Sequence, residues 1–543
     1  MPSQIQPSQV LSGLPRRLSE VFAHWVEHSP EHLALVEASG SWTYGQLASV
    51  TSETRSWLSH LGVRPGDRVM IVGENSRAFI ALLLATTDLD AWPVLVNARL
   101  SLREVDIIRE HSGARLVLYT TEVSPHARDH ANAHGAAWAK VGRLGSIAAS
   151  PLNESAQPEP VDAQISERVA ALIYTSGTTG VPKGVMLSHR NLLYVAAVSA
   201  KIRSLTPNDR MYGVLPMTHA VGLSVVLLGT LLSGATLYLT PRFDPITARK
   251  ALENDRLTIV LGVPSMFAQF LQYAKLRGIE SLNLPDLRII SSSGAPLDAP
   301  TKKATEAFFR MPLHNGYGIT ECSPNIAQTR VETPRRDTSV GQLLPGMEAK
   351  FVGPSGDELP SGEVGELWLR GPNIMKGYYR AVEATAEAIN QDGWFNTRDL
   401  AKLENGNLFV VGRTKDLIVR SGFNVYPVEV EAVLNAHPAV LQSAVIGRSV
   451  EGDEEILAFV QPLHGADVTS TELAEFAAKH LATYKRPTRI SIMSALPATA
   501  TGKVAKAELR KIVEDPIFDA NRFATVESAQ IRATSATIEP QST

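Results

Sequence analysis

The segment Tyr174-Thr-Ser-Gly-Thr-Thr-Gly-Val-Pro-Lys-Gly184 directly follows an apolar, strand-like run at residues 170–174. It gathers hydroxyl side chains, glycines and a lysine within one short stretch. Glycines let backbone N–H groups approach phosphate oxygens, hydroxyls donate further hydrogen bonds, and Lys183 supplies a positive charge. It is not a Walker A loop, because Lys183 is followed by Gly184 rather than by Ser or Thr. The segment predicts a phosphate-binding loop, with a flexible turn as the alternative.

Apolar runs and helical stretches alternate through the first half of the chain. Strands are predicted at residues 68–72, 170–174, 258–262 and 287–291, and a helix at residues 77–88. Buried parallel strands form near-continuous apolar runs of this kind, so the pattern predicts a mainly parallel α/β sheet covered by helices. Short strands and turns between residues 340 and 411 predict a small antiparallel β unit.

The pattern changes again after Gly412-Arg-Thr-Lys-Asp416, where a compact α/β segment begins. A helix is predicted at residues 428–435, and Thr469-Ser-Thr-Glu472 matches a capping box that opens a helix to about residue 482. We therefore predict an N-terminal domain at 1–414 and a C-terminal domain at 415–523. Residues 524–543 are polar and aperiodic, which predicts a disordered tail.

The composition of the 543 residues is that of a soluble globular protein with more than one core. A net charge of −3 without long single-sign runs gives no indication of a nucleic-acid partner. The single cysteine, Cys322, rules out an internal disulfide and favours a cytoplasmic location. Residues 221–239 are apolar enough to suggest a membrane span, but their glycines and serines predict a buried helix that ends near Gly234 and a buried strand after it.

Further motifs lie on both sides of the phosphate loop. In sequence and in their order along the chain, they resemble the motifs of the acyl-adenylate-forming (ANL) superfamily. That superfamily contains acyl-CoA synthetases, peptide-synthetase adenylation domains and firefly-type luciferases. Each motif is a weak signal alone, but the collinear series covers nearly the whole chain. The motifs are Trp42-Thr-Tyr-Gly-Gln-Leu47, Arg64-Pro-Gly-Asp-Arg-Val69, Leu215-Pro-Met-Thr-His219, Ser293-Gly-Ala-Pro296, Asn315-Gly-Tyr-Gly-Ile-Thr-Glu321, Trp394-Phe-Asn-Thr-Arg-Asp399, Gly412-Arg-Thr-Lys-Asp416, Ser421-Gly-Phe-Asn424 and Thr501-Gly-Lys503.

The resemblance implies a multidomain α/β fold. A large N-terminal domain of two α/β subdomains plus a β unit would be followed by a small, mobile C-terminal α+β lid with its hinge at Lys415. It also implies an ATP-dependent acid–CoA ligase that uses Mg²⁺ and takes CoA as a substrate. The acid would be adenylated with release of pyrophosphate and then transferred to CoA with release of AMP. We expect a monomer or homodimer that acts on small molecules and has no membrane span.

The resemblance also assigns site residues, position by position. The catalytic set that the resemblance implies is Lys503, Glu321, Thr320 and His219. Lys503 resembles the catalytic lysine that bridges carboxylate and α-phosphate, and Glu321 resembles the Mg²⁺ carboxylate. Tyr317 would stack on adenine, and Asp399 would accept both ribose hydroxyls beside Arg413. The full nucleotide-binding set is Thr175, Ser176, Gly177, Thr178, Thr179, Gly180, Lys183, Ser293, Gly294, Ala295, Pro296, Asn315, Gly316, Tyr317, Gly318, Thr320, Asp399 and Arg413. The thioester step would use Arg420, Ser421, Gly422, Phe423 and Asn424.

The acyl group is the least determined part of the sequence interpretation. The acyl pocket is predicted to consist of His219, Ala220, Val221, Gly222, Val263, Ser293 and Gly294. These mostly small residues suit an aromatic, alicyclic or medium-chain monocarboxylate, and His219 would gate the acyl or CoA channel. Malonate-activating relatives place an arginine near the position of Asn315-Gly316, so a dicarboxylate is disfavoured. Cys322 is expected to be a semi-buried thiol without a nucleophilic role.

Other interpretations stay open at this point. A luciferase-like monooxygenase shares every motif. A carrier-protein-loading amino-acid adenylating enzyme would place an aspartate for the substrate amine just after the position of His219, and residues 219–229 contain none. A non-catalytic nucleotide-binding module is the alternative from a different class, although it has no need of Lys503 and Glu321 together. Outside this context, Asp399 and Arg413 would be an ordinary surface ion pair. Arg398 stands where many relatives carry Gly or Ser, which affects the expected loop geometry beside Asp399.

Overall fold

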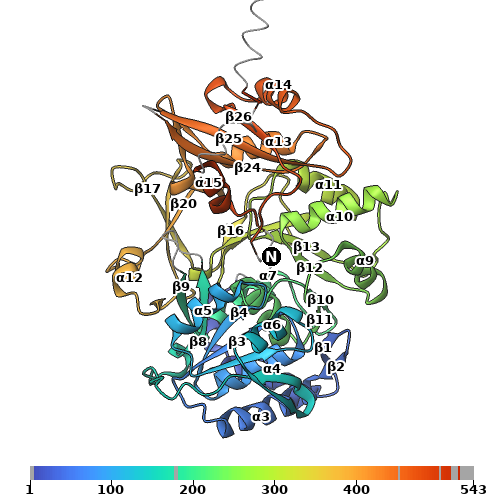
Figure 1. Ribbon diagram of the computed structural model, residues 1–543, viewed down its shortest axis with the longest axis vertical. Helices are drawn as coiled ribbons and strands as arrows, with labels where there is room; N and C mark the ends of the chain where they lie inside the picture. The colour runs from blue at the N-terminus through green and yellow to red at the C-terminus, as the bar shows by residue number, and fades with distance from the viewer. Residues whose placement is uncertain (1–4, 176–181, 451–452, 500–502, 515–523, 526–543) are drawn as a thin grey trace, which may run out of the picture.

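The computed structural model describes residues 5–175, 182–450, 453–499, 503–514 and 524–525. Two large sheets form the centre of the N-terminal part. The C-terminal elements lie at the end of the molecule opposite β3, β4 and β8 (Figure 1). The expected multidomain α/β fold, with a large N-terminal part and a small C-terminal one, is confirmed. The boundary at residue 415 and the mobility of the C-terminal part stay predictions.

The first sheet has an eight-strand order of β19-β9-β8-β4-β3-β5-β7-β6. Its centre, β8 to β5, is parallel, and the strands on both edges are antiparallel. Both faces of the central strands are buried, which explains their continuous apolar sequences. The strands are β3 (Arg68–Gly73), β4 (Trp92–Asn97), β5 (Leu116–Thr120), β6 (Ala137–Val141), β7 (Gly145–Ala149), β8 (Val169–Thr175), β9 (Lys183–Ser188) and β19 (Gly377–Tyr378).

The second sheet has nine strands in the order β16-β15-β14-β13-β12-β10-β11-β1-β2. The strands from β14 to β1 run parallel, again with antiparallel edges. The strands are β1 (Leu33–Glu37), β2 (Gly40–Thr43), β10 (Arg210–Gly213), β11 (Thr236–Leu239), β12 (Ile259–Gly262), β13 (Ile289–Ser293), β14 (Leu313–Gly318), β15 (Asn325–Gln328) and β16 (Gln342–Leu343). The prediction of parallel sheets is confirmed, and the motifs at Ser293 and Tyr317 lie at the ends of neighbouring strands β13 and β14.

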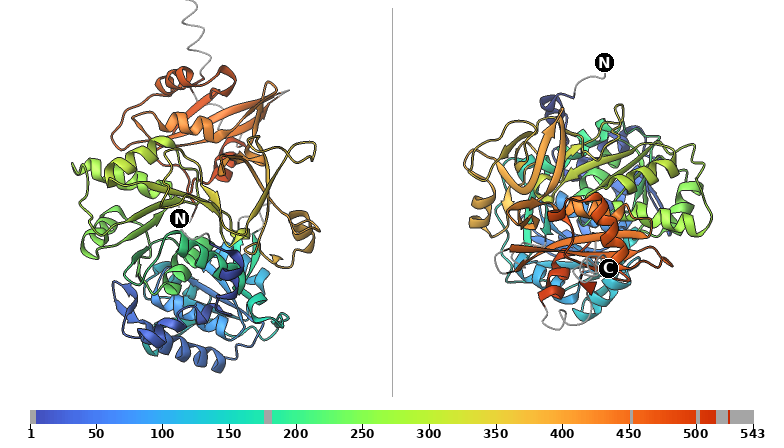
Figure 2. Two further views of the ribbon diagram at one scale, coloured as in Figure 1. Left: turned by 180° about the vertical axis from the view of Figure 1, so that it is seen from behind. Right: turned by 90° about the horizontal axis from the view of Figure 1, so that it is seen from above.

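Helices cover these sheets, as expected from the alternating pattern (Figure 2). The predicted helix at residues 77–88 is α4 (Arg77–Asp88). The other α-helices of seven or more residues in this part are α3 (Tyr44–His60), α5 (Leu102–Ser112), α6 (Pro125–Ala133), α7 (His189–Ile202), α9 (Pro245–Asn254), α10 (Pro264–Leu276), α11 (Ala299–Phe309) and α12 (Val382–Ala388). Shorter helices include α1 (Pro7–Ser12), α2 (Ala23–His28) and the 3-10 helix η1 (Leu18–Glu20).

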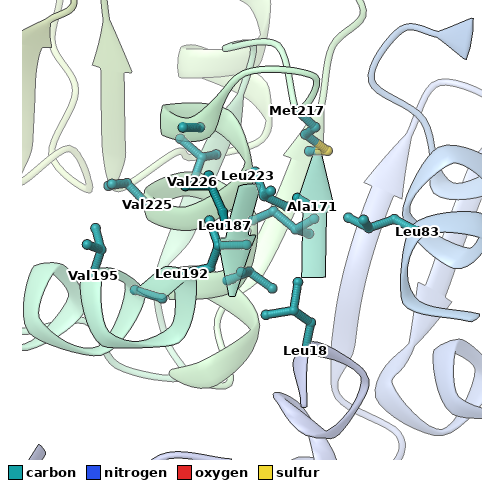
Figure 3. Close-up of a cluster of buried hydrophobic side chains, with 14 of the residues drawn as sticks. Leu18, Leu83, Ala171, Leu187, Leu192, Val195, Met217, Leu223, Val225 and Val226 are labelled. Carbon is teal, nitrogen blue, oxygen red and sulfur yellow. The ribbon is translucent and has the colours of Figure 1, made fainter. Parts of the chain in front are cut away.

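The apolar segment at 221–239 is a buried helix followed by a buried strand, as predicted. A π-helix, η4 (Val221–Leu228), continues into α8 (Gly229–Leu232), and the chain turns at Gly234 with φ +73° into β11. No helix in the described part of the chain is long and apolar enough to cross a membrane. Figure 3 shows η4 packed into the core, where side chains from η1, α4, β8, β9, α7 and η4 meet: Leu18, Leu83, Ala171, Leu187, Leu192, Val195, Leu223, Val225 and Val226.

A four-stranded antiparallel sheet, β17-β18-β20-β21, confirms the predicted β unit. Its strands are β17 (Glu348–Val352), β18 (Gly365–Arg370), β20 (Phe395–Glu404) and β21 (Asn407–Arg413). Asp399 on β20 pairs directly with Arg413 on β21. The two motifs that contain these residues are therefore neighbours because of the sheet register.

The C-terminal part begins with the 3-10 helix η6 (Thr414–Asp416) and the hairpin β22 (Ile418–Arg420) and β23 (Phe423–Val425). A second sheet follows, with β24 (Val440–Val450), β25 (Asp453–Pro462), β26 (Arg489–Ile492) and β27 (Ala524–Thr525). The predicted helices are α13 (Pro427–Asn435) and α14 (Ser470–His480), and Thr469 caps α14 in a capping box with Glu472. The last helix is α15 (Lys506–Glu514). Of the predicted tail, Ala524–Thr525 pair with β26, and residues 526–543 lie outside the described residues.

His189, the first residue of α7, gives the fold a dependence on pH. Its ring is 1% exposed, and Nδ1 accepts a hydrogen bond from the N–H of Leu18 at 3.1 Å. Burial lowers the pKa of His189 to about 3, and Arg17 and Arg168 lower it further while Asp90 opposes them. The folded protein therefore holds the neutral ring at pH values where the unfolded chain, with a pKa of about 6.5, binds a proton.

We predict that the free energy of unfolding falls as the pH drops from about 6.5 toward 3, by up to about 1.4 kcal/mol per pH unit from His189. His189→Asn keeps an acceptor near the N–H of Leu18 but cannot bind the proton, so this acid-dependent loss should become smaller. Urea unfolding at several pH values measures it, with His126→Asn at an exposed position as the control. Equal slopes in the wild type and in His189→Asn would contradict the prediction.

Candidate active site

The predicted phosphate loop connects two paired strands of the first sheet. Thr175 at the end of β8 pairs with Lys183 at the start of β9, and the two strands are antiparallel neighbours. Gly184 packs tightly against β8, because a Cβ there would lie 3.1 Å from Leu172 Cδ1 and from Tyr174 Cζ. The predicted ligands Ser176, Gly177, Thr178, Thr179 and Gly180 lie outside the described residues.

Lys183 and Glu321 lie on two sides of one tyrosine that the sequence interpretation missed. The Lys183 ammonium is 5.0 Å from the ring centroid of Tyr378, and the Tyr378 hydroxyl donates to Glu321 Oε1 at 3.0 Å. Glu321 and Thr320 belong to the 3-10 helix η5 (Thr320–Cys322) that follows β14. The structure thus brings the phosphate-loop lysine and the predicted metal ligand to one place.

Glu321 fits a role in holding Mg²⁺ together with nucleotide phosphates. Burial raises the pKa of its carboxyl, although the hydrogen bond from Tyr378 opposes this. A nearby divalent cation would favour the ionised form. The described residues contain no group of three or more His, Cys, Asp or Glu side chains that could hold a metal ion alone. This agrees with Mg²⁺ sites in which one or two carboxylates share the ion with substrate phosphates.

Asp399 is the centre of a second polar cluster. It is 3% exposed, accepts from Arg413 Nε at 3.0 Å and also accepts from the Tyr317 hydroxyl. Its N–H donates to Thr397 Oγ1 at 3.0 Å, which anchors the strand. Burial raises the pKa of Asp399, and Arg413 and Tyr317 oppose that rise. The bond from its hydroxyl to Asp399 fixes the ring of Tyr317 at one end.

The neighbouring Arg398 has the left-handed φ of +58°, a backbone region that favours glycine. This accounts for the glycine that many relatives are expected to carry there. Asn396 supports the turn, because its side chain accepts a hydrogen bond from the Arg398 N–H at 2.8 Å. The turn that presents Asp399 is therefore formed here without glycine.

Lys503 reaches this site from the C-terminal part. A Cβ on Gly294 would lie 3.6 Å from Lys503 Cε, 3.9 Å from its Nζ and 3.6 Å from Val263 Cγ1. Gly294 has φ +83°, so it forms the turn after β13 that leaves room for this lysine. Although the residue as a whole is exposed, protein atoms around the ammonium lower its pKa, Arg413 lowers it further and Asp399 opposes.

His219 lies close enough to Lys503 to be affected by its charge. Burial lowers the pKa of His219 to about 4, and Lys503 contributes to that shift, so the ring is neutral at physiological pH. Its Nε2 is buried and has no hydrogen-bond partner among the described residues. The buried hydroxyl of Thr218 likewise has no hydrogen-bond partner among the described residues. Buried polar atoms normally have partners, which makes these two candidates for contact with a substrate.

The remaining acyl-pocket residues differ in what surrounds them. Ala220 and Val263 are buried, whereas Val221, Ser293 and Gly294 are partly exposed. At Gly222 a Cβ would lie 2.1 Å from the carbonyl oxygen of Pro216, so glycine is needed for η4 to pack against the 215–216 backbone. This close approach gives Gly222 a structural function that the sequence interpretation did not include.

Of the adenine-motif residues, Ser293 ends β13, where it pairs with Gly316 of β14. The residues that follow β13 are Gly294, Ala295 and Pro296, and those on β14 are Asn315, Gly316, Tyr317 and Gly318. The Asn315 amide is buried and donates to the carbonyls of Thr338 and Ser339 at 3.1 and 3.3 Å, so it ties a neighbouring loop to the strand. Gly318 approaches the carbonyl of Pro324 so closely that a Cβ would lie 2.1 Å from it. At these two positions the motif has a structural function as well as its predicted binding role.

The predicted hinge and thioester-step residues lie in the C-terminal part. Lys415 is in the middle of η6 and is exposed. The hairpin residues Ser421, Gly422, Phe423 and Asn424 are exposed as well, and Gly422 has φ +78° at the turn. Arg420 Nη1 donates to the carbonyl of Arg486 at 2.6 Å, and the Ser421 N–H donates to Asp453 at 2.7 Å. In this arrangement the hairpin is held within the C-terminal part, while the side chain of Lys503 lies next to Gly294.

Cys322 is completely buried in the main core, rather than semi-buried as expected. Burial raises the pKa of its thiol well above the usual value, which opposes formation of a nucleophilic thiolate.

We predict that Cys322→Ala keeps full turnover and lowers the free energy of unfolding by about 1–2 kcal/mol, because only one buried atom is lost. Thermal or urea unfolding beside a turnover assay measures both. Loss of turnover in a folded variant would contradict the prediction.

Comparison with known proteins agrees with this geometry. A family model described as AMP-binding enzyme matches residues 22–379, and a model of the AMP-binding enzyme C-terminal domain matches residues 429–503. The chain belongs to the AMP-binding enzyme family. This AMP-binding enzyme is 36% identical over 488 residues to a feruloyl-CoA synthase from Amycolatopsis sp, covering 89% of this chain and 96% of the relative.

Two further comparisons cover most of this AMP-binding enzyme. A 4-coumarate–CoA ligase from Vanilla planifolia is 31% identical over 490 residues, covering 86% of this chain and 88% of the relative. The solved O-succinylbenzoate coenzyme A synthetase (MenE) from Bacillus subtilis, in complex with ATP and magnesium ion, has a TM-score of 0.77 and 28% identity, covering 90% of this chain and 99% of that one. These relatives support an AMP-forming acid–CoA ligase that binds ATP, as the motifs predicted.

Proposed function

We propose that this acid–CoA ligase activates an aromatic monocarboxylic acid of the cinnamate type. In the first half-reaction a carboxylate oxygen forms a bond to the α-phosphorus of ATP, and the bond to pyrophosphate breaks. In the second, the thiol sulfur of CoA attacks the carbonyl carbon, AMP leaves, and the thiol proton is released. The observation that carries the proposal is the position of Lys503 beside Gly294, Val263 and His219.

Each cluster has a task in this reaction. Lys503 would stabilise negative charge where carboxylate and α-phosphate meet, because a preorganised cation in a crowded site acts there without reorganisation. Asp399, held by Arg413 and Tyr317, has the acceptor capacity to bind ribose hydroxyls. Mg²⁺, held by Glu321 and the nucleotide phosphates, would supply charge neutralisation. Lys183 at the start of β9 would contact the departing phosphates.

The acyl assignment rests on the surroundings of His219 and on the named relatives. A neutral His219 adds no charge to the pocket, and Ala220 and Val263 are small or medium apolar residues. Such a lining accepts a flat ring better than a second carboxylate, which would be buried without a partner. Two of the relatives that resemble this chain are a feruloyl-CoA synthase and a 4-coumarate–CoA ligase.

A panel of acids tests the proposal directly. Ferulate, 4-coumarate, cinnamate, benzoate, octanoate and malonate would each be assayed for acid-dependent ATP–pyrophosphate exchange and for CoA-dependent AMP release. We expect the cinnamates to give the greatest kcat/KM and malonate to give none. A preference for octanoate would replace the aromatic assignment with a medium-chain one. Exchange without CoA-dependent AMP release, or O₂ uptake with the acyl-adenylate, would favour a carrier-loading or luciferase-like enzyme.

A further inference from the structure

Tyr378 contacts Glu321 and Lys183, which the proposed mechanism uses, although it lies outside the two motifs that contain them. Its hydroxyl donates to Glu321 Oε1 at 3.0 Å, and its ring centroid lies 5.0 Å from the Lys183 ammonium. A tyrosine offers both contacts at once, because the ring face attracts a cation and the hydroxyl donates to a carboxylate. The side chain is half-buried between them.

The backbone around Tyr378 is tied to both neighbours. Strand β19 pairs with β9, so that Tyr378 lies opposite Val185, and the Tyr379 N–H donates to the carbonyl of Gly184 at 2.7 Å. On the other side, the Met375 N–H donates to the carbonyl of Glu321 at 2.8 Å. The segment at 375–379 therefore connects the backbone next to Lys183 with the backbone of Glu321.

The third attachment comes from α12. The Tyr378 N–H donates to Thr385 Oγ1 at 2.9 Å, and Gly377, with φ +138°, lets Thr385 approach so closely that a Cβ would lie 2.8 Å from Thr385 Cγ2. Backbone atoms held on three sides leave the tyrosine ring few alternative positions. This rigidity is what a residue needs if it is to orient another side chain.

We propose that Tyr378 is a positioning residue that orients Glu321 for metal binding and keeps the Lys183 ammonium beside it. The inference rests on the proposed function, in which Glu321 and the ATP phosphates share the divalent cation. Removing a hydrogen-bond donor from a metal-binding side chain typically costs about 10–100-fold in metal affinity. The hydroxyl and the ring have separate effects, so two substitutions distinguish them.

Tyr378→Phe keeps the ring beside Lys183 and removes only the bond to Glu321. Tyr378→Leu removes both contacts. Tyr379→Phe is the matched control, because it makes the same change one residue along, where the hydroxyl donates to Glu159. Mn²⁺ serves as the probe, and its binding to the enzyme–ATP complex is measured by electron paramagnetic resonance, with ATP binding measured by calorimetry.

We expect Tyr378→Phe to raise the Mn²⁺ dissociation constant at least about 10-fold and to leave ATP affinity at saturating metal within about 3-fold. Tyr378→Leu should also weaken ATP binding, and Tyr379→Phe should change neither value. In a double-mutant cycle, Tyr378→Phe should add little in a Glu321→Gln background. Unchanged Mn²⁺ binding in folded Tyr378→Phe, or an equal loss in Tyr379→Phe, would overturn the inference. Because Mn²⁺ and ATP binding need no acid or CoA, failure of the acid panel would contradict the proposed function without affecting this test.

Discussion

Lys503→Ala is expected to lose adenylation by about 10²–10³-fold while it still converts a synthetic acyl-adenylate and CoA to thioester. The reason is the position of the ammonium beside Gly294, where carboxylate and α-phosphate would meet. Charge builds up there only while the α-phosphorus is attacked. Thioester formation expels AMP from an adenylate that already exists, so it does not need that cation.

Single-turnover assays of the two half-reactions measure this effect. Cinnamoyl-adenylate with CoA reports the second step alone, and pyrophosphate release reports the first. Lys511→Ala is the matched control, because this lysine lies on α15 with 70% of its side chain exposed and pairs with the local Glu508. If Lys503→Ala impaired both steps equally, the lysine would have a structural function rather than the proposed one.

Lys415→Pro is expected to show the opposite result, with adenylation retained and thioester formation lost. In the structure Lys503 is at the site while the hairpin at 420–424 is held by Asp453 and Arg486, which is the arrangement proposed for adenylation. Passing the acyl group to CoA would require the C-terminal part to rotate about residue 415. Proline fixes its own φ near −65° and restricts Thr414 before it, so the backbone could not absorb a large dihedral change.

Lys415→Ala separates the backbone effect from the loss of the side chain. Alanine removes the ammonium and leaves the backbone free, so both half-reactions should continue in that variant. A thermal melt establishes that Lys415→Pro is folded before the assays are compared. Equal losses in the proline and alanine variants would assign the effect to the lysine side chain, and full thioester formation in Lys415→Pro would contradict a hinge at this position.

The elements that the sequence predicted best are those with strong local patterns. The continuous apolar runs that became β3 and β8, the helix α4 and the capping box of α14 each follow from neighbouring residues alone. The β unit was also predictable, because turn residues separate its short strands. Register was not predictable in this way, yet it is the register of β20 and β21 that puts Asp399 opposite Arg413.

Several site residues had no sequence signal strong enough to find them. Tyr378 acts through a hydroxyl and a ring face that meet Glu321 and Lys183, which lie 57 and 195 positions away in the chain. The packing functions of Gly222 and Gly318 depend on carbonyl groups that approach from other segments. The depth of Cys322 was underestimated for the same reason, since the side chains that cover it come from the assembled core.

The sequence by itself determined the family, the α/β architecture, the order of the motifs and the chemical type of each candidate residue. These depend on residue identity and local spacing, which are fully present in the chain. Only the tertiary structure decided which groups meet: Lys503 with Gly294, Tyr317 with Asp399, and Tyr378 with both Glu321 and Lys183. The physical reason is that these contacts join segments far apart in sequence, so their distances, burial and pKa shifts arise only when separate sheets and the C-terminal part pack together.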